Sequence, residues 1–232
     1  MSTNYIPALR IPSKTVKPTA TVIFIHGLGD SGHGWKFLSD LSHQSSEFDH
    51  ISFIFPHAPK IPLTVSNGEI VSGWFDIYQF GGKGNKHDFD GYLKSIEQIK
   101  LLINEQISNG IKPERIIIGG FSQGAAITLG TLTTLDLKLG AFIPLSAPIT
   151  QFLQLLKSKQ LKFNIDTPVF HGQGDSDPIV SIDTGNQAAD FFQNTLGYTN
   201  YKYKTYKGLG HSANNDEIEE IFKLFRKVLP KE

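Results

Sequence analysis

A serine flanked by glycines is the residue whose setting most clearly suggests chemistry. Gly120-Phe121-Ser122-Gln123-Gly124 fits the pattern G-x-S-x-G, between the apolar run Arg115–Ile118 and the helical run Ala125–Leu135. A strand–turn–helix setting projects such a hydroxyl at the end of the strand, and glycines leave room for the neighbouring backbone. Ser122 is therefore predicted to be a nucleophile. The alternatives are an N-capping serine and a phosphate-binding glycine loop, although the loop Gly119–Gly124 has neither the ending G-K-[ST] nor the spacing G-x-G-x-x-G.

A serine hydroxyl needs an adjacent base to attack at neutral pH. In enzymes with this serine motif, an acid and then a histidine follow the nucleophile along the chain. Of the eight histidines, only His171 and His211 follow Ser122. His211 lies in the glycine-rich loop Gly208–Ser212, which can reach back over a sheet edge, so we predict it as the base. A helix-capping surface histidine is the alternative, and His171 is expected to be structural.

The partner acid should lie before His211 at the end of a strand. Asp175 and Asp177 both satisfy this condition, in the run Gly172-Gln173-Gly174-Asp175-Ser176-Asp177-Pro178. We predict Asp177, because the following proline restricts its backbone toward an extended conformation. Asp175 remains the alternative, since either carboxylate could orient an imidazole while the other braces the loop.

Two backbone amides should complete such a site by binding the oxyanion. One is the amide of Gln123, which follows the nucleophile, and the other should come from a loop after an early strand. Leu28, between two glycines in His26-Gly27-Leu28-Gly29-Asp30, fits the second position. A plain glycine turn is the alternative. His26 also raises the question of a metal, but the chain has no cysteine and no H-E-x-x-H, so neither a metal nor another cofactor is expected.

These residues require an alternating sheet-and-helix scaffold. Continuous apolar runs indicate strands covered on both faces, and they alternate with segments of helical periodicity. The predicted strands are Thr21–His26, Ile51–Phe55, Arg115–Ile118, Ala141–Leu145, Pro168–His171 and Tyr201–Tyr206. The predicted helices are Gly34–Leu41, Asp88–Asn109, Ser122–Leu135, Thr184–Thr195 and Asn214–Val228. This alternation predicts an open, doubly wound, mostly parallel sheet of α/β-hydrolase type, in a single domain over residues 1–232.

One segment departs from the alternation. His57–Lys86 is interrupted by proline and glycine and carries Trp74-Phe75, and a long irregular connection in a compact domain is usually functional or disordered. We interpret it as a loop-rich functional segment.

Composition excludes several classes of function. Lys and Arg together number 22, as do Asp and Glu, so no charge surplus indicates nucleic acid as a partner. No apolar stretch approaches 18 residues and no signal-peptide core is present. Ser2 stands where myristoylation needs glycine, and no C-terminal cysteine allows prenylation. We therefore expect no integral membrane association and a cytoplasmic, possibly also nuclear, location.

Six ordered motifs make the chain similar to a known family. It resembles the acyl-protein thioesterase and lysophospholipase-like carboxylesterases, and the matching motifs span nearly the whole chain. They are V-I-F-I-H-G-L-G-D-S-G-H-G-W at 22–35, P-H-A-P at 56–59, W-F-D-I at 74–77, I-I-I-G-G-F-S-Q-G-A-A at 116–126, D-S-D-P-I-V at 175–180 and G-L-G-H-S at 208–212.

The resemblance implies a catalytic triad and a substrate class. It selects Ser122, Asp177 and His211 as the triad and Leu28 and Gln123 as oxyanion donors. It implies hydrolysis of S-acyl thioesters on proteins, of lysophospholipids and of small esters, without a cofactor. The segment around Leu63–Trp74 is expected to border an acyl channel, with Trp74 and Ile179 binding substrate.

Departures from the family leave other hypotheses open. Val71-Ser72-Gly73 replaces the methionine-proline-serine run that family members often carry, which bears on the shape of the pocket. No N-terminal cysteine is available for acylation. A short-chain carboxylesterase with the same triad, and a non-catalytic ligand-binding module on the same scaffold, remain the alternatives.

Overall fold

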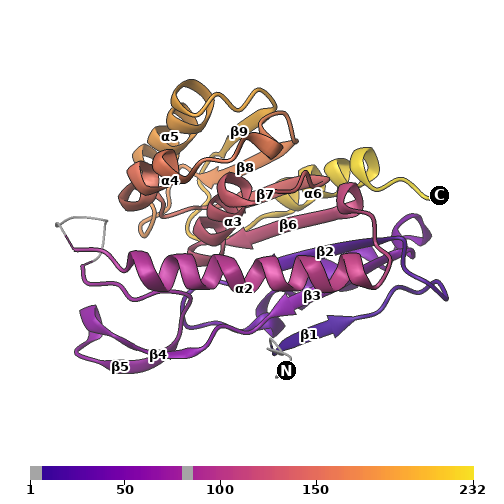
Figure 1. The fold of residues 1–232 in the computed structure, drawn as a ribbon, viewed down its shortest axis with the longest axis horizontal. Coiled ribbons are helices and arrows are strands. Elements are labelled where there is room, and N and C mark those ends of the chain that lie inside the picture. The colour runs from indigo at the N-terminus through magenta and orange to yellow at the C-terminus, as the bar shows by residue number, and fades with distance from the viewer. Residues whose placement is uncertain (1–6, 80–85) are drawn as a thin grey trace.

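Seven strands form the central sheet of the protein (Figure 1). The computed structural model describes residues 7–79 and 86–232. The strand order is β1-β3-β2-β6-β7-β8-β9, and every neighbouring pair is parallel except β1 with β3. The bounds are β1 Ala8–Ile11, β2 Ala20–Ile25, β3 Ile51–Pro56, β6 Ile116–Phe121, β7 Ala141–Leu145, β8 Val169–Gly174 and β9 Tyr201–Tyr206. The predicted open, mostly parallel sheet is confirmed.

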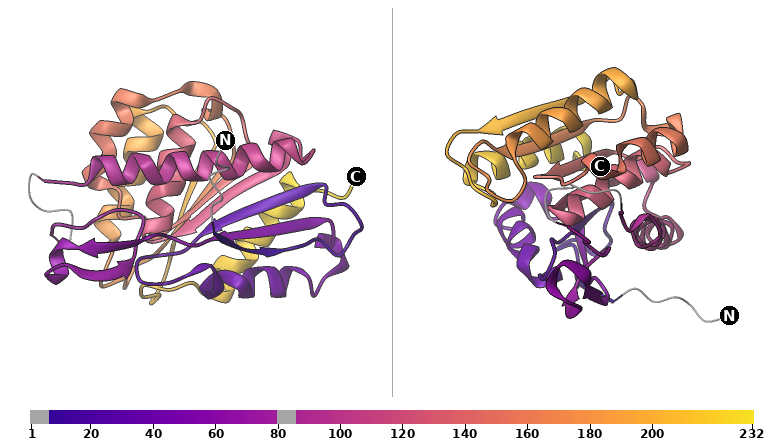
Figure 2. Two further views of the ribbon diagram at one scale, coloured as in Figure 1. Left: turned by 60° about the horizontal axis from the view of Figure 1, so that its bottom comes forward. Right: turned by 90° about the vertical axis from the view of Figure 1, so that its left-hand side faces the viewer.

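Helices cover both faces of this sheet, as the two turned views show (Figure 2). Along β2, Ile23 and Ile25 pack in the cluster that holds the apolar side chains of α2 and α3. The alternate residues Val22 and Phe24 pack in a second cluster with α1 and α6. The helix bounds are α1 Lys36–Ser42, α2 Phe89–Ser108, α3 Gln123–Thr134, α4 Leu153–Lys159, α5 Ile182–Asp190 and α6 Asn215–Val228. Burial on both faces explains why the strands are continuously apolar.

Four elements were not predicted from the sequence. The edge strand β1 is short and only partly buried, so it lacks the long apolar run of the central strands. The short helix α4 was also missed. In the segment expected to be irregular, β4 Lys60–Leu63 and β5 Glu69–Ser72 form an antiparallel hairpin, although β4 carries Pro62. The hairpin is a sheet of its own and lies at the lower left of Figure 1.

Element boundaries differ from the prediction by a few residues. Helix α5 begins at Ile182, before the predicted Thr184, because the Ser181 hydroxyl accepts the Thr184 N–H at 3.3 Å and caps the helix. Its predicted last turn, Phe191–Thr195, is a π-helix. Residues 1–6, which include Ser2, and residues 80–85 of the segment 57–86 lie outside the described residues. Within the described residues, no helix combines the length and apolar character needed to span a bilayer.

Candidate active site

Ser122 occupies a sharp turn between β6 and α3. Its φ of 54° and ψ of −120° are rare for a residue with a side chain, and such conformations concentrate at functional sites. The turn is tight because α3 approaches β2 directly: a Cβ on Gly124 would lie 2.1 Å from the Ile25 carbonyl oxygen. Although Ser122 precedes α3, its side chain makes no capping hydrogen bond. The N-capping alternative for Ser122 is therefore wrong, and its hydroxyl is available for another partner.

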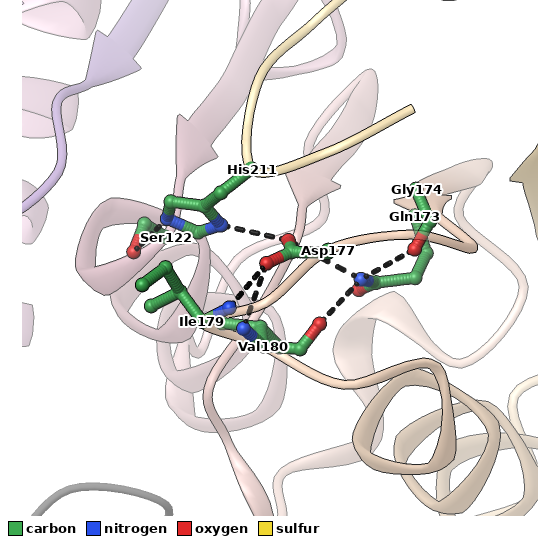
Figure 3. A network of polar contacts seen from close by, with 7 residues as sticks. All are labelled: Ser122, Gln173, Gly174, Asp177, Ile179, Val180 and His211. Atoms are coloured by element: carbon green, nitrogen blue, oxygen red, sulfur yellow. Dashed lines mark hydrogen bonds and ion pairs between the residues drawn. The ribbon is translucent and has the colours of Figure 1, made fainter. Parts of the chain in front are cut away.

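That partner is His211, which in turn contacts Asp177 (Figure 3). His211 Nε2 lies 3.0 Å from Ser122 Oγ, and His211 Nδ1 lies 2.7 Å from Asp177 Oδ2. A proton on Nδ1 donates to the carboxylate and leaves Nε2 free to accept the serine proton. The Asp177 side chain is fully buried, and its Oδ1 accepts the N–H groups of Ile179 at 2.8 Å and Val180 at 2.9 Å. The carboxylate is thus held while it orients the imidazole.

Asp175 and His171 occupy structural positions near this row of side chains. Asp175 Oδ1 accepts the Gly208 N–H at 2.7 Å and so braces the loop that carries His211. His171 is fully buried on β8, with Nδ1 2.9 Å from the Tyr201 hydroxyl, and burial lowers its pKa to about 3. It is therefore neutral at physiological pH. Of the two aspartates that the sequence left open, Asp177 is the one that contacts the histidine.

Leu28 and Gln123 present their backbone amides beside Ser122. Across residues 7–79 and 86–232, neither amide donates a hydrogen bond to another group of the protein. The two chain segments lie close together, since a Cβ on Gly27 would lie 3.3 Å from Ser122 Cβ. Two unpaired donors next to a serine hydroxyl are suited to stabilise an oxyanion.

His26 holds the start of the Leu28 loop. It is completely buried, its Nε2 accepts the Ala58 N–H at 3.1 Å and its Nδ1 lies 2.7 Å from the Gly27 carbonyl oxygen. Burial lowers the pKa of His26, so the ring is neutral and bound on both nitrogens. Both contacts are with the backbone, and among the described residues no group of three or more His, Asp or Glu could hold a metal ion. His26 is therefore a structural residue of the loop.

A cavity of about 320 Å³ opens over the serine. Its wall combines apolar side chains with residues of the candidate site. The lining includes Leu28, Phe75, Ile77, Phe121, Ser122, Gln123, Pro148, Ile179, Val180 and His211. A mostly apolar cavity with a few convergent polar groups is the usual form of a small-molecule site.

The two residues predicted to bind substrate have different positions. Ile179 lines the cavity and is 63% exposed. Trp74 is only 2% exposed and does not line the cavity, and its indole contacts His26 instead. The segment Leu63–Trp74 contributes no lining residue either. Among the described residues of 57–86, those that line the cavity are Phe75, Ile77 and Gln79, which directly follow the expected segment in the chain.

Gln173 is a site residue that the sequence reasoning missed. Its Nε2 lies 3.5 Å from Asp177 Oδ2 and donates to the Val180 carbonyl at 2.8 Å, inside the loop that holds the carboxylate (Figure 3). It is fully buried at the end of β8. A polar amide at the end of a buried strand was the available signal, since buried amides are found hydrogen-bonded.

The sheet order, the serine turn and the histidine loop define an α/β-hydrolase. The chain belongs to the phospholipase/carboxylesterase family, whose model matches residues 7–229. Acyl-protein thioesterase 1 of Debaryomyces hansenii is 44% identical over 232 residues, covering 97% of this chain and 98% of that protein. The Candida albicans acyl-protein thioesterase 1 is 43% identical over 230 residues, covering 97% and 99%. The crystal structure of Zea mays acyl-protein thioesterase 2 is similar with a TM-score of 0.83 and 25% identity, covering 97% of this chain and 100% of that one.

Proposed function

We propose that this protein is a serine hydrolase that cleaves S-acyl thioesters on proteins, and also lysophospholipids and small esters. The observation that carries the proposal is the row Asp177–His211–Ser122, with contacts of 2.7 and 3.0 Å beside a largely apolar cavity. The similarity to acyl-protein thioesterases of two yeasts supports the thioester substrate. The apolar wall suits an acyl chain, and the proposed contact of Ile179 with that chain is supported by its position in the cavity lining.

The reaction takes place in two steps. His211 Nε2 accepts the Ser122 proton as Oγ attacks the carbonyl carbon, and the Leu28 and Gln123 amides stabilise the oxyanion. The tetrahedral intermediate collapses, and the leaving thiol or alcohol takes the proton from His211. Water then gives a proton to His211 and attacks the acyl-serine. The second tetrahedral intermediate collapses to release the fatty acid, and Ser122 Oγ takes the proton back from His211, which restores the hydroxyl and the neutral imidazole. Asp177 stabilises the imidazolium in both steps, and each proton passes through His211 Nε2.

Covalent labelling tests whether Ser122 is the nucleophile. A fluorophosphonate probe should label the wild-type protein, and Ser122→Ala should lose all labelling and all ester hydrolysis while it keeps the wild-type melting temperature. Ser212→Ala is the matched control, because Ser212 lies beside the histidine without contacting Ser122. Equal labelling of Ser122→Ala and wild type would exclude this site, and a wild-type protein that resists labelling would favour a ligand-binding module.

A chain-length profile tests the substrate class. Hydrolysis should be fastest on a palmitoylated peptide, with lysophosphatidylcholine and a short-chain ester slower at equal concentration. A preference for the short-chain ester would favour the carboxylesterase alternative. The cytoplasmic or nuclear location remains a prediction, and imaging of a tagged chain tests it.

A further inference from the structure

Trp74 directly precedes Phe75, which lines the cavity, and its side chain is bonded to the loop that carries Leu28. Its indole Nε1–H donates to the His26 carbonyl at 2.8 Å, two residues before Leu28. The indole ring also packs on the His26 ring, with centroids 5.2 Å apart. A second bond joins the same segments, from the Gly29 N–H to the Ser72 carbonyl at 2.7 Å. Residues on both sides of Leu28 are therefore tied to the residues 72–74.

The same segment is connected to the second oxyanion amide through a side chain. Gln123 Oε1 accepts the Trp74 N–H at 2.9 Å, and Gln123 Nε2 donates to the Phe75 carbonyl at 2.9 Å. Both bonds are buried, since Gln123 is 1% exposed. The amide side chain of Gln123 is thus a two-point link, while its backbone N–H makes no hydrogen bond within the described residues.

The connecting segment is itself anchored to the body of the fold. The Ser95 hydroxyl of α2 donates to the Trp74 carbonyl, so all three polar groups of Trp74 are hydrogen-bonded. The Leu28 side chain rests on the same segment, because a Cβ on Gly73 would lie 3.1 Å from Leu28 Cδ1. The glycine that departs from the family run therefore allows Leu28 to pack closely.

We propose that Trp74 is a positioning residue that sets the separation of the two oxyanion amides. Its indole N–H holds the Leu28 loop, and its backbone N–H holds the residue whose own amide is the second donor. This inference rests on the proposed function, because the two amides matter only if an oxyanion forms there. Oxyanion donors act by being fixed before the charge develops, so a small displacement weakens the transition state more than the bound substrate.

Removal of the indole N–H tests the proposal. Trp74→Phe deletes the donor and keeps an aromatic ring. Incorporation of benzothienylalanine at position 74 is sharper, because it keeps the ring volume and replaces only the N–H by sulfur. Trp35→Phe is the matched control, since Trp35 is a buried tryptophan that stacks on Phe24 in the other core cluster.

Both position-74 proteins should lose about 10- to 100-fold in kcat, with KM within about threefold of wild type. Outright loss of one oxyanion donor costs about 10²- to 10³-fold, so a displaced donor should cost less. Affinity for a long-chain trifluoromethyl ketone, which forms an oxyanion on addition of Ser122, should fall in parallel with kcat. Affinity for the free fatty acid should not change, and Trp35→Phe should keep kcat within about threefold.

Three results would overturn the positioning role. They are an unchanged kcat in the benzothienylalanine protein, a loss that lies in KM alone, and an equal loss of kcat in Trp35→Phe. If Trp74→Phe fails to fold, the benzothienylalanine protein decides. Fluorophosphonate labelling of the wild type separates this outcome from failure of the proposed function: a labelled, active wild type with active position-74 variants rejects only the role of Trp74. An unlabelled, inactive wild type rejects both.

Discussion

At Asp177 the two carboxylate oxygens have separate tasks. Oδ1 accepts two backbone N–H groups, which fixes the direction of the carboxylate, and Oδ2 meets the imidazole at 2.7 Å. Neighbouring Asp175 uses Oδ1 to hold the Gly208 N–H instead. The two acids, two positions apart in sequence, therefore differ in whether they contact the proposed base, His211, or the loop that carries it.

Substitution of each aspartate distinguishes these tasks. Asp177→Asn should lower kcat by about 10⁴, because the amide can no longer stabilise the imidazolium or enforce its tautomer. Asp175→Asn should cost about 10-fold or less, since the loop keeps its other contacts. Steady-state kinetics on a small ester measure both values. Comparable losses in the two variants, or a larger loss in Asp175→Asn, would contradict the assignment.

Helix α6 carries a buried acid at its first turn. Glu217 is 1% exposed and packs on β8, so a Cβ on Gly172 would lie 2.0 Å from its Oε1. Among the described residues, neither carboxyl oxygen has a hydrogen-bond partner. Burial raises the pKa of Glu217 from 4.5 to about 8, so the carboxyl is mainly protonated at neutral pH.

This acid should make stability depend on pH. Between pH 4.5 and 8 the folded protein holds a proton that the unfolded chain has released, so the free energy of unfolding falls as the pH rises. The loss is on the order of a few kcal/mol, at about 1.4 kcal/mol per pKa unit. Glu217→Gln cannot ionise and should gain stability relative to wild type as the pH rises, measured by urea unfolding at pH 5, 7 and 9. Glu219→Gln, at an exposed position of the same helix, should keep the wild-type slope. Parallel profiles for Glu217→Gln and wild type would contradict the assignment.

The serine turn between β6 and α3 depends on close backbone contact. Gly124→Ala would place a methyl group 2.1 Å from the Ile25 carbonyl oxygen, so the helix must move away from β2. We expect a loss of about 1–3 kcal/mol or more in unfolding free energy and a large loss of kcat. Gly210→Ala is the control for stability, because nothing lies within 4 Å of its Cβ. Chemical denaturation measures both variants, and equal stabilities would show that the turn tolerates a side chain.

At the scale of the whole molecule, one sheet separates two apolar clusters and brings distant residues together. Ser122 and His211 are 89 positions apart, yet their side chains meet where β6 ends and the loop after β9 returns. The parallel order of the strands places these loops at the same edge of the sheet. The site therefore depends on the integrity of both clusters.

Core truncation should show that the two clusters unfold together. Ile96 is a buried residue of α2 in one cluster, and Ile96→Ala should lower the free energy of unfolding by about 2–5 kcal/mol. Phe225 is a buried residue of α6 in the other cluster, and Phe225→Ala should lower it by about 3–5 kcal/mol. Each variant should melt in a single calorimetric transition at a lower temperature, since the shared sheet couples the clusters. Two separated transitions in either variant would indicate independent units.

The sequence by itself predicted the main sheet and singled out Ser122 and His211, whose side chains meet in the structure. The apolar runs of the central strands are long because both faces are buried, and the loop residues that carry the site stand directly after those runs. Because the base is expected to follow the nucleophile along the chain, only two of the eight histidines, His171 and His211, are candidates for the base. The small hairpin β4–β5 and the edge strand β1 escaped prediction because neither shows a long apolar run.

Tertiary structure decided what the side chains touch. Asp175 and Asp177 have the same chemistry and nearly the same position along the chain, and only the return of the histidine loop shows which one faces the imidazole. The family resemblance predicts that Trp74 binds substrate, yet its two N–H donors meet the Gln123 side chain and the His26 carbonyl. Periodicity reports which face of an element is apolar, whereas hydrogen-bond partners from distant segments are set by how the elements pack.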